Sequence, residues 1–364
     1  MKELARKEIF KVAPYVPGKP IEEVQREMGL KEVIKLASNE SPLPPSKRAI
    51  KAIVTAAKGL NRYPDGSSYY LRRKLARKLR VNENQFTLGN GSDELIVLAV
   101  RALVNPGEEI IVAKPTFLIY GIAATISGAK VIAVPMKDFR YDLEAMQAKI
   151  SPRTKLIFIA NPDNPTGSYV TQTEVEKFLE GIPENILVFF DEAYFELVDK
   201  QDYPDTIELQ KRYRNLVISR TFSKAYSLAG LRLGYCIADK TIAECLNRVR
   251  EPFNINSLAQ EAALVSLDDT SRLKALKKLI REGREYLIDN FEELGLEFVP
   301  PAANFILINL KQNGSSIAGR LLKQGVIVRD MSSWGLKNFI RVTVGTMREN
   351  RKFVAELKRI ITIK

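Results

Sequence analysis

The sequence of 364 residues contains no histidine, only two cysteines and no long hydrophobic run. Without histidine, catalytic triads and histidine-ligated metals are excluded, so proton transfer must use Lys, Tyr, Asp, Glu or Cys. Cys236 and Cys245 alone form neither a disulfide framework nor a thiolate cluster, and we expect no metal site. No segment approaches the roughly 20 apolar residues of a membrane span, and the charged N-terminal segment lacks the apolar core of a signal peptide. We therefore expect a cytoplasmic protein.

Basic residues outnumber acidic ones by 56 to 43, which gives a net charge of +13. Such an excess favours either nucleic acid or anionic small molecules as partners. The basic residues concentrate in segments 71–80 and 271–291, where apolar residues recur with helical spacing. This pattern is typical of solvated helix faces, so we expect small anionic substrates and no nucleic acid.

Through about residue 255, short apolar runs rich in β-branched residues alternate with helical patterns. The runs are EEIIVAK, AKVIAVPM, TKLIFIAN, NILVFFDEAY, NLVISRTFS and LRLGYCIA. This alternation predicts an α/β fold whose mostly parallel sheet is covered by helices on both faces. One helix start is marked by a capping box, Thr171 with Glu174.

After about residue 256 the pattern changes to two long helices, followed by strands LEFVP, ANFILINL and FIRVTVG and helices SIAGRLLKQG and RENRKFVAELKRII. The chain also exceeds the roughly 250 to 300 residues of a single core. We predict a large domain in residues 41–255 and a smaller α+β domain in residues 256–364. Residues 1–40 are predicted to form an N-terminal arm that is part of the small domain, with a cleft between the domains.

Ligands of open α/β sheets bind beyond the carboxyl ends of the strands, so residues just after the apolar runs are informative. A Gly-Asn-Gly turn leads into the helix that begins near Ser92, and its backbone amides suit a phosphate. A tight turn with an N-cap explains the same residues. The segment NPDNPTG, residues 161–167, forms a rigid loop that either fixes the side chain of Asn164 toward a ligand or is purely structural.

Two further strand ends carry charged residues. Asp191 follows the apolar residues 186–190, so we expect a cationic partner for its buried carboxylate, and Tyr194 can point into the same site. Lys224 follows another run, and a desolvated lysine is a nucleophile toward aldehydes, whereas an exposed loop lysine is the ordinary alternative. Arg232 lies in a strand-like run and would be buried, so we expect it to meet an anion.

These groups together match one cofactor, pyridoxal 5'-phosphate. Its aldehyde requires a lysine, its phosphate a helix N-terminus with Arg and Ser, its ring nitrogen a carboxylate, and its phenolic oxygen Tyr and Asn donors. The sequence contains each of these groups.

Nearly the full chain resembles the fold-type I, class II aminotransferases, which use pyridoxal phosphate, and within them the histidinol-phosphate aminotransferases. The matching stretches are LASNESPLPPSKRAI, NRYPDGSSYYLRRKLA, GNGSDELI, KPTFLIY, NPDNPTG, DEAYFE, RTFSKAYSLAGLRLGY, NFIRVTVGT and MRENRKF. NPDNPTG departs from the usual NPNNPTG, and KAYSLAG from KAFGLAG. The resemblance implies the fold-type I architecture, with a large cofactor-binding domain and a small α+β domain.

The resemblance also implies a role for each matching residue. Lys224, Asp191 and Tyr194 would be catalytic: the lysine forms a Schiff base, the carboxylate pairs with the pyridinium nitrogen, and the tyrosine with Asn164 bonds the phenolic oxygen. The other implied cofactor-binding residues are Gly91, Ser92, Asp93, Thr221, Ser223 and Arg232 at the phosphate, Phe117 on the ring, and Tyr63, which would reach the phosphate of a neighbouring subunit. A homodimer is therefore expected.

For the substrate, Arg341 and Arg329 match anion-binding arginines, while Tyr15 and Asn39 match residues that border the substrate. Alternatively, the two arginines are ordinary charged residues at strand edges. Asn39 could simply form a turn before Pro42. The implied reaction is transamination of L-histidinol phosphate with 2-oxoglutarate, which gives imidazole acetol phosphate and glutamate in histidine biosynthesis.

Other readings of the same motifs remain. A threonine-phosphate decarboxylase uses the same scaffold, and so do aminotransferases for aromatic or other amino acids. Transcription factors with an aminotransferase-like sensor carry a DNA-binding domain of roughly 60 or more residues before it. Here the matching motifs begin at about residue 36, so we expect no such domain and no sensor of this kind.

Overall fold

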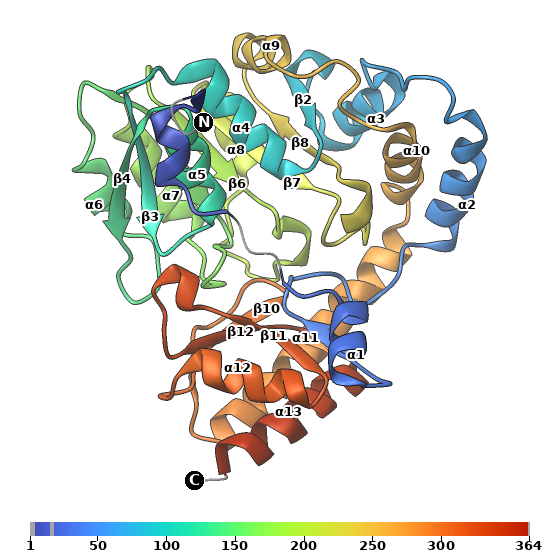
Figure 1. Ribbon diagram of the computed structural model, residues 1–364. Helices are drawn as coiled ribbons and strands as arrows, with labels where there is room; N and C mark the ends of the chain where they lie inside the picture. Colours follow the sequence, from blue (N-terminus) through green and yellow to red (C-terminus); the bar gives the residue numbers. More distant parts are fainter. Residues whose placement is uncertain (1–3, 15–17, 363–364) are drawn as a thin grey trace.

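The computed structural model describes residues 4–14 and 18–362, which form two domains (Figure 1). The large domain is built on a seven-stranded sheet with the strand order β2-β8-β7-β6-β5-β3-β4. Its strands are β2 (Phe86–Gly89), β3 (Glu109–Lys114), β4 (Lys130–Pro135), β5 (Thr154–Ala160), β6 (Leu187–Asp191), β7 (Leu216–Thr221) and β8 (Gly234–Ile237). Within this sheet β8 alone runs against the other strands, so the mostly parallel α/β sheet is confirmed.

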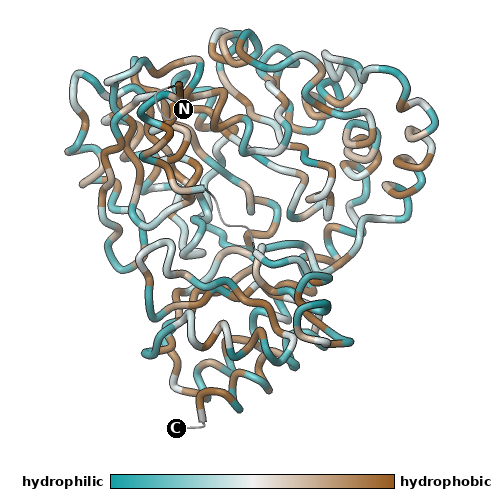
Figure 2. The backbone as a smooth tube through the Cα atoms, viewed as in Figure 1, coloured by the Kyte–Doolittle hydropathy of each residue, from teal (hydrophilic) through white to brown (hydrophobic). Residues whose placement is uncertain are grey.

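Helices cover both faces of the large sheet (Figure 1). They are α2 (Lys47–Ala56), α3 (Tyr69–Leu79), α4 (Ser92–Leu103), α5 (Leu118–Ile126), α6 (Leu143–Gln147), α7 (Gln172–Glu180), α8 (Thr206–Arg212), α9 (Lys240–Arg248) and α10 (Ser257–Ser266), with short 3-10 helices between them. Alternate residues of β5 face opposite cores: Ile157 and Ile159 lie in one and Leu156 and Phe158 in the other. Figure 2 shows the hydrophobic residues concentrated along these central strands.

The small domain contains a five-stranded sheet with the order β1-β11-β12-β10-β9. Its strands are β1 (Ile34–Leu36), β9 (Glu297–Phe298), β10 (Phe305–Asn309), β11 (Val326–Asp330) and β12 (Phe339–Thr343), and its helices are α1 (Ile21–Met28), α11 (Thr270–Glu293), α12 (Gly314–Lys323) and α13 (Met347–Thr362). Strand β1 pairs in parallel with β11, so the N-terminal segment completes this sheet. In the described residues, no helix combines the length and apolar character needed to cross a membrane.

Helix α10 marks where the large domain ends. Its buried residues Ala259, Ala262 and Ala263 belong to the large-domain core, and the helix packs against α2 and α3. The next helix, α11, buries Leu276 and Ile280 in the small-domain core. We therefore propose a boundary near residue 267 in place of the sequence-based boundary at 255, because the apolar face of α10 is covered by α2.

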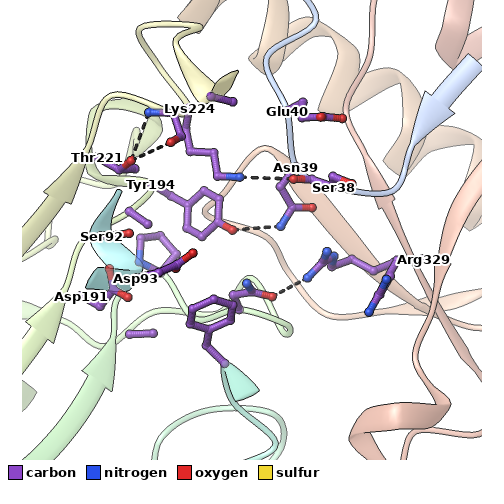
Figure 3. A pocket seen from close by; sticks show the side chains of 18 of the residues that line it. Ser38, Asn39, Glu40, Ser92, Asp93, Asp191, Tyr194, Thr221, Lys224 and Arg329 are labelled. Atoms are coloured by element: carbon purple, nitrogen blue, oxygen red, sulfur yellow. Dashed lines mark hydrogen bonds between the residues drawn. The ribbon is translucent and has the colours of Figure 1, made fainter. Parts of the chain in front are cut away.

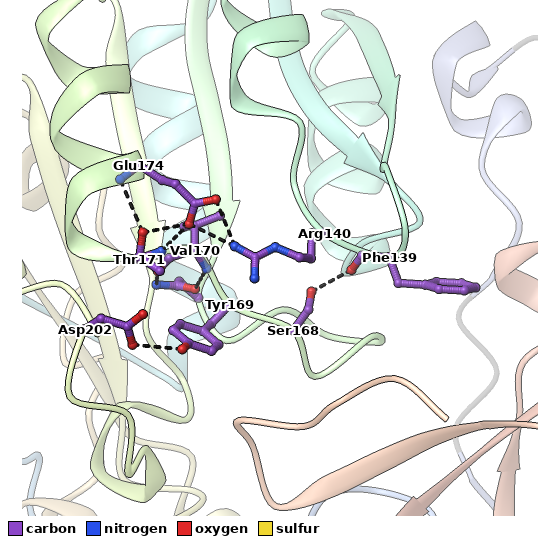
Figure 4. Close-up of polar contacts among 9 residues, drawn as sticks. Phe139, Arg140, Ser168, Tyr169, Val170, Thr171, Glu174 and Asp202 are labelled. Carbon is purple, nitrogen blue, oxygen red and sulfur yellow. Dashed lines mark hydrogen bonds and ion pairs between the residues drawn. The ribbon is translucent and has the colours of Figure 1, made fainter. Parts of the chain in front are cut away.

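The loop between β5 and α7 is held at both ends by polar contacts (Figure 4). The side chain of Asn161 donates to the carbonyl of Val170 and accepts from its amide, at 3.1 and 2.9 Å. The capping box is confirmed: Thr171 and Glu174 bond reciprocally, and Arg140 donates to the same glutamate at 2.9 Å. These contacts fix the loop that carries Asn164 against the large domain.

Candidate active site

A cavity of about 460 Å³ lies between the two domains, at the carboxyl ends of β5, β6 and β7. Most of the residues that the sequence singles out line it: Asn39, Ser92, Asp93, Phe117, Asn164, Asp191, Tyr194, Thr221, Ser223, Lys224, Arg232, Arg329 and Arg341. Figure 3 shows Lys224 and Arg329 entering the cavity from opposite domains. The structure thus brings together residues that are far apart in the sequence, and the expected cleft between the domains is present.

Lys224 lies three residues beyond β7, with its side chain extended into the cavity (Figure 3). Its Nζ donates to the carbonyl of Ser38 at 3.2 Å and lies 5.7 Å from the centre of the Tyr194 ring. Burial, together with the positive charge of Arg341, lowers the pKa of Lys224 to about 8. A pKa of about 8 leaves roughly a tenth of the amine unprotonated at pH 7, which makes this lysine a usable nucleophile and base.

Asp191 is the last residue of β6, and its carboxylate is buried. Its Oδ2 accepts a hydrogen bond of 2.7 Å from the hydroxyl of Tyr120, whereas Oδ1 has no partner among the described residues. Burial raises the pKa of Asp191 to about 7. The expected cationic partner is therefore not supplied by the described part of the chain; a neutral tyrosine holds one oxygen and leaves the other directed at the cavity.

Tyr194 and Asn39 meet at the centre of the cavity. The side-chain amide of Asn39 donates to the Tyr194 hydroxyl at 2.9 Å, and the Asn39 backbone amide donates to Thr343 at 2.9 Å. Asn39 has φ of 54°, a left-handed conformation that asparagine tolerates better than most residues. Asn39 therefore forms a turn, which was the alternative to a substrate-binding role in the sequence analysis. The same turn points its side chain at the candidate active site.

The N-terminus of α4 forms one end of the cavity. Gly91 precedes the helix with φ of +81°, and a Cβ there would lie 2.4 Å from Nη2 of Arg232. Ser92 and Asp93 form the first turn, and the hydroxyl of Thr221 donates to Ser223 at 3.0 Å beside it. Backbone amides, hydroxyls and a guanidinium thus converge on one point, which is the arrangement of an anion site.

The prediction of a buried Arg232 inside a strand was wrong. The residue ends a 3-10 helix, has φ of 55° and precedes β8 by two residues. Its side chain is 44% exposed and pairs with Asp93 at 3.3 Å. The left-handed conformation of Arg232 delays the start of the strand until Gly234, and its guanidinium reaches across to Gly91 instead of pointing into the core.

Two arginines form the opposite end of the cavity. Arg329 on β11 and Arg341 on β12 are direct cross-strand partners. Arg341 is buried; its Nη1 donates to Oδ1 of Asn164, and its Nη2 donates to the carbonyl of Ala37 at 3.1 Å. Like charges opposite each other in a sheet are unfavourable, so the pair indicates a site where an anion is bound. Asn164 here contacts Arg341, a contact the sequence did not predict.

One of the expected site residues stands apart from the cavity, and another is not described. Tyr63 is 83% exposed and stacks on Phe253 with ring centres 4.8 Å apart, away from the residues that line the cavity. Tyr15 lies outside the described residues. Conversely, the prediction from sequence missed Tyr120, which lies in the first turn of α5 three positions after Phe117, with the two ring centres 5.6 Å apart.

Comparison with known proteins agrees with this geometry. Residues 31–357 match the family model of aminotransferase class I and II. The chain is 47% identical to a histidinol-phosphate aminotransferase of Moorella thermoacetica, over 98% of this chain and 92% of that protein. It is 45% identical to histidinol-phosphate aminotransferase 1 of Nitrosococcus oceani, over 99% and 97%.

A solved structure shares the same fold. The histidinol-phosphate aminotransferase of Sinorhizobium meliloti, crystallised with pyridoxal-5'-phosphate, superposes with a TM-score of 0.90 at 29% identity, covering 98% of this chain and 97% of that one. The fold, the assembled site and the match over residues 31–357 lead to one conclusion: the chain belongs to the class I and II aminotransferase family.

Proposed function

We propose that the protein transfers the amino group of L-histidinol phosphate to 2-oxoglutarate, which gives imidazole acetol phosphate and glutamate, with pyridoxal 5'-phosphate as cofactor. Relatives at 45–47% identity over nearly the whole chain bear the histidinol-phosphate aminotransferase name. The observation that carries the proposal is the arginine pair, Arg329 opposite Arg341, facing Lys224 across the cavity. Two guanidinium groups suit a phosphate, and they also suit the carboxylates of glutamate.

The cavity fits pyridoxal phosphate on three counts. Asp191 presents a buried oxygen without a partner among the described residues, as a protonated ring nitrogen requires. Lys224 is the lysine among the described residues that line the cavity, and its pKa is lowered to about 8. The N-terminus of α4 offers a phosphate site beside the backbone of Gly91, where a Cβ would meet Arg232.

Each cofactor-binding role follows from these positions. The phosphate would be held by Gly91, Ser92, Asp93 through its backbone, Thr221, Ser223 and Arg232; the ring by Phe117, Asp191, Tyr194 and Asn164; the aldehyde by Lys224. When bound, the cofactor supplies an aldehyde that condenses with amines and a ring that stabilises negative charge on the adjacent carbon.

The chain's own residues then position and move protons. Lys224, once its amine is released, takes the proton from Cα of the substrate, because its lowered pKa makes the free amine available near neutral pH. Asp191, anchored by Tyr120, carries the negative charge that keeps the ring nitrogen protonated. Asn39 holds the Tyr194 hydroxyl in place at 2.9 Å, so that it can donate to an oxygen in the cavity.

The two substrates differ in their anionic groups, and the arginine pair explains how one site accepts both. Histidinol phosphate carries a phosphate and no carboxylate, whereas glutamate carries two carboxylates. Arg341 is fixed by Asn164 and by the carbonyl of Ala37, while Arg329 lies over the ring of Trp334. A planar guanidinium can bond bidentately to either group, so the same two residues serve both half-reactions.

We also propose a homodimer in which Tyr63 acts across the interface. Tyr63 and Phe253 stack on the surface, and the nearby residues Ile50, Val54 and Leu60 of α2 and its C-terminal extension are exposed as well. Exposed apolar patches of this kind are typical of interaction surfaces. Mixing inactive Tyr63→Ala and Lys224→Ala chains should restore activity, because one site of the mixed dimer then contains both native residues; a monomer would give no restoration.

The decisive experiment follows the spectral change from the pyridoxal to the pyridoxamine form with single substrates. We expect conversion with L-histidinol phosphate and with glutamate, and reversal with 2-oxoglutarate. Histidinol without the phosphate serves as the matched donor, and we expect at least a tenfold lower kcat/KM for it. Equal activity on both donors would contradict the proposal in favour of a broad aminotransferase. Release of carbon dioxide from threonine phosphate would instead identify a decarboxylase.

A further inference from the structure

Trp334, the single tryptophan of the sequence, joins the two domains beside the candidate active site. It lies in a 3-10 helix (Ser332–Trp334) between β11 and β12, the strands that carry Arg329 and Arg341. Its side chain is buried, and its indole N–H donates a 2.9 Å hydrogen bond to the backbone carbonyl of Thr116 in the large domain. A tryptophan of the small domain is thereby tied to the backbone beside Phe117.

The ring of Trp334 also supports an arginine. The guanidinium carbon of Arg329 lies 5.2 Å from the ring centre, within the range of a cation–π contact. Trp334 therefore contacts, on one side, a residue proposed to bind the substrate anion. On the other side, it bonds the residue that precedes Phe117, which faces the cofactor position.

Thr116 extends this connection into the loop that carries Asn164. Its hydroxyl donates to Oδ1 of Asp163 at 2.8 Å, and Oδ2 of Asp163 accepts from the amide and the hydroxyl of Thr166 at 3.1 and 2.9 Å. Asp163 is fully buried and immediately precedes Asn164. The two loops that line the cofactor position are thus joined to each other, and Trp334 bonds to them at Thr116.

The packing around Trp334 shows that the contact is built from both domains. Val299, Leu307 and Met331 of the small domain surround it, and Leu118 and Phe139 of the large domain pack against the same cluster. Phe139 and Phe339 meet with ring centres 5.3 Å apart. Within this apolar contact, the indole N–H donates to a buried carbonyl, which a hydrocarbon side chain could not do.

We propose that Trp334 is a positioning residue that couples the substrate-anion site at Arg329 to the cofactor-facing loop at Thr116 and Phe117. Substrate phosphate bound at Arg329 then stabilises the same domain arrangement that places Phe117. This inference rests on the proposed function for the identity of the donor. It predicts effects on anion binding that a purely structural core residue would not produce.

The first test uses fluorescence, because all indole emission comes from Trp334. The cofactor-loaded enzyme is titrated with inorganic phosphate, since the cofactor's own phosphate then occupies the α4 site. We expect a saturable change in emission in the wild-type enzyme and its loss in Arg329→Ala. An emission that phosphate leaves unchanged in the wild-type enzyme would overturn the proposal. This readout does not depend on which amino donor the enzyme uses.

The second test separates the hydrogen bond from the packing. Trp334→Phe keeps an aromatic ring beside Arg329 and removes the N–H donor, whereas Phe339→Leu perturbs the same cluster away from Arg329 and Thr116. We expect Trp334→Phe to raise the KM for histidinol phosphate about tenfold with kcat changed less than about threefold, and Phe339→Leu to lower thermal stability with KM unchanged. Equal KM values for Trp334→Phe and wild type would refute the coupling. If the wild-type enzyme does not use histidinol phosphate, the proposed function fails, and the phosphate titration still decides the role of Trp334.

Discussion

The two ends of the active-site cavity offer an anion different kinds of support. At the α4 end, backbone amides at the helix start, the hydroxyls of Thr221 and Ser223, and Arg232 all belong to the large domain. At the opposite end, Arg329 and Arg341 stand on neighbouring strands of the small domain. The geometry of the α4 end is set within the large domain alone. The geometry of the opposite end depends on the register of β11 and β12 and on how the two domains pack together.

The difference extends to how each arginine is held. Arg232 is 44% exposed and has an acidic partner, Asp93, so its charge is already balanced before any ligand binds. Arg341 is buried and contacts neutral oxygens of Asn164 and Ala37. A buried guanidinium gains more from an incoming anion than a half-exposed one, because water screens a buried charge less. We therefore expect specificity to reside at the small-domain end and cofactor retention at the α4 end.

The largest effect should come from Lys224, which lies between the two ends. Lys224→Ala removes the amine that we propose attaches to the cofactor and moves the substrate proton, and we expect kcat to fall by on the order of 10⁴-fold. Borohydride treatment of the wild-type enzyme followed by mass mapping should place the reduced adduct on Lys224. Lys240→Ala, an exposed helix residue, serves as the control with unchanged activity. An adduct on another lysine would refute the assignment.

Asp191→Asn should give the next largest effect, on the order of 10³-fold in kcat, because it removes the charge that we propose keeps the ring nitrogen protonated. The variant also has a signature in the cofactor-free protein. The pKa of Asp191 is raised from 3.8 to about 7 on folding, so between these pH values the folded state holds a proton that the unfolded state lacks. Stability therefore falls as pH rises through this window.

The pH dependence of unfolding provides the check on Asp191. Asp163 and Glu196, whose pKa values are raised by burial to about 6 and about 7, titrate in the same direction. We expect urea unfolding of the cofactor-free Asp191→Asn variant to show a reduced slope between pH 4 and pH 7, not a flat one. An unchanged slope together with near-normal turnover would reduce Asp191 to a buried strand-end carboxylate.

Sequence patterns located the large-domain residues because each is specified by local signals. Asp191 ends an apolar strand rich in aromatic residues, Lys224 lies three residues beyond the next strand, and the start of α4 is marked by the glycines that precede Ser92. Such signals lie within a few residues of one another, so a single segment contains them. Their convergence at the carboxyl ends of parallel strands follows from the topology of the sheet.

Contacts between distant segments were not available from the sequence. The bond from Tyr120 to Asp191 depends on how α5 packs against β6, and the opposition of Arg329 and Arg341 depends on the register of β11 and β12. Arg232 was misplaced because a left-handed residue interrupts an apolar run without glycine at that position. Packing and backbone conformation, not composition, decide these features.

Arg341→Lys tests the small-domain end of the comparison. The ammonium group cannot reproduce a bidentate contact while also bonding Asn164 and the carbonyl of Ala37. We expect a loss of about 2–4 kcal/mol in kcat/KM, roughly 30-fold to 1000-fold, for both histidinol phosphate and 2-oxoglutarate. Arg329→Ala should behave similarly, and the affinity for the cofactor should stay within about threefold. Arg351→Lys, on the exposed face of α13, is the control; a drop in cofactor affinity in Arg341→Lys would show that the two ends are not separate.

Gly91→Ala tests the α4 end and should have the smallest effect. The alanine Cβ would lie 2.4 Å from Nη2 of Arg232. The alanine would also have to adopt the φ of +81° that Gly91 has, which alanine disfavours. A left-handed alanine costs about 1–2 kcal/mol, so we expect the Kd for the cofactor to rise about tenfold, measured by equilibrium titration of the cofactor-free enzyme. The matched control is Gly121→Ala on α5, where a Cβ meets no atom within 4 Å. At saturating cofactor, the KM for histidinol phosphate should equal that of the wild-type enzyme, because Arg329 and Arg341 stand on another domain. A raised KM with an unchanged cofactor Kd would mean that the start of α4 contributes to the substrate site, and the separation of the two ends would fail.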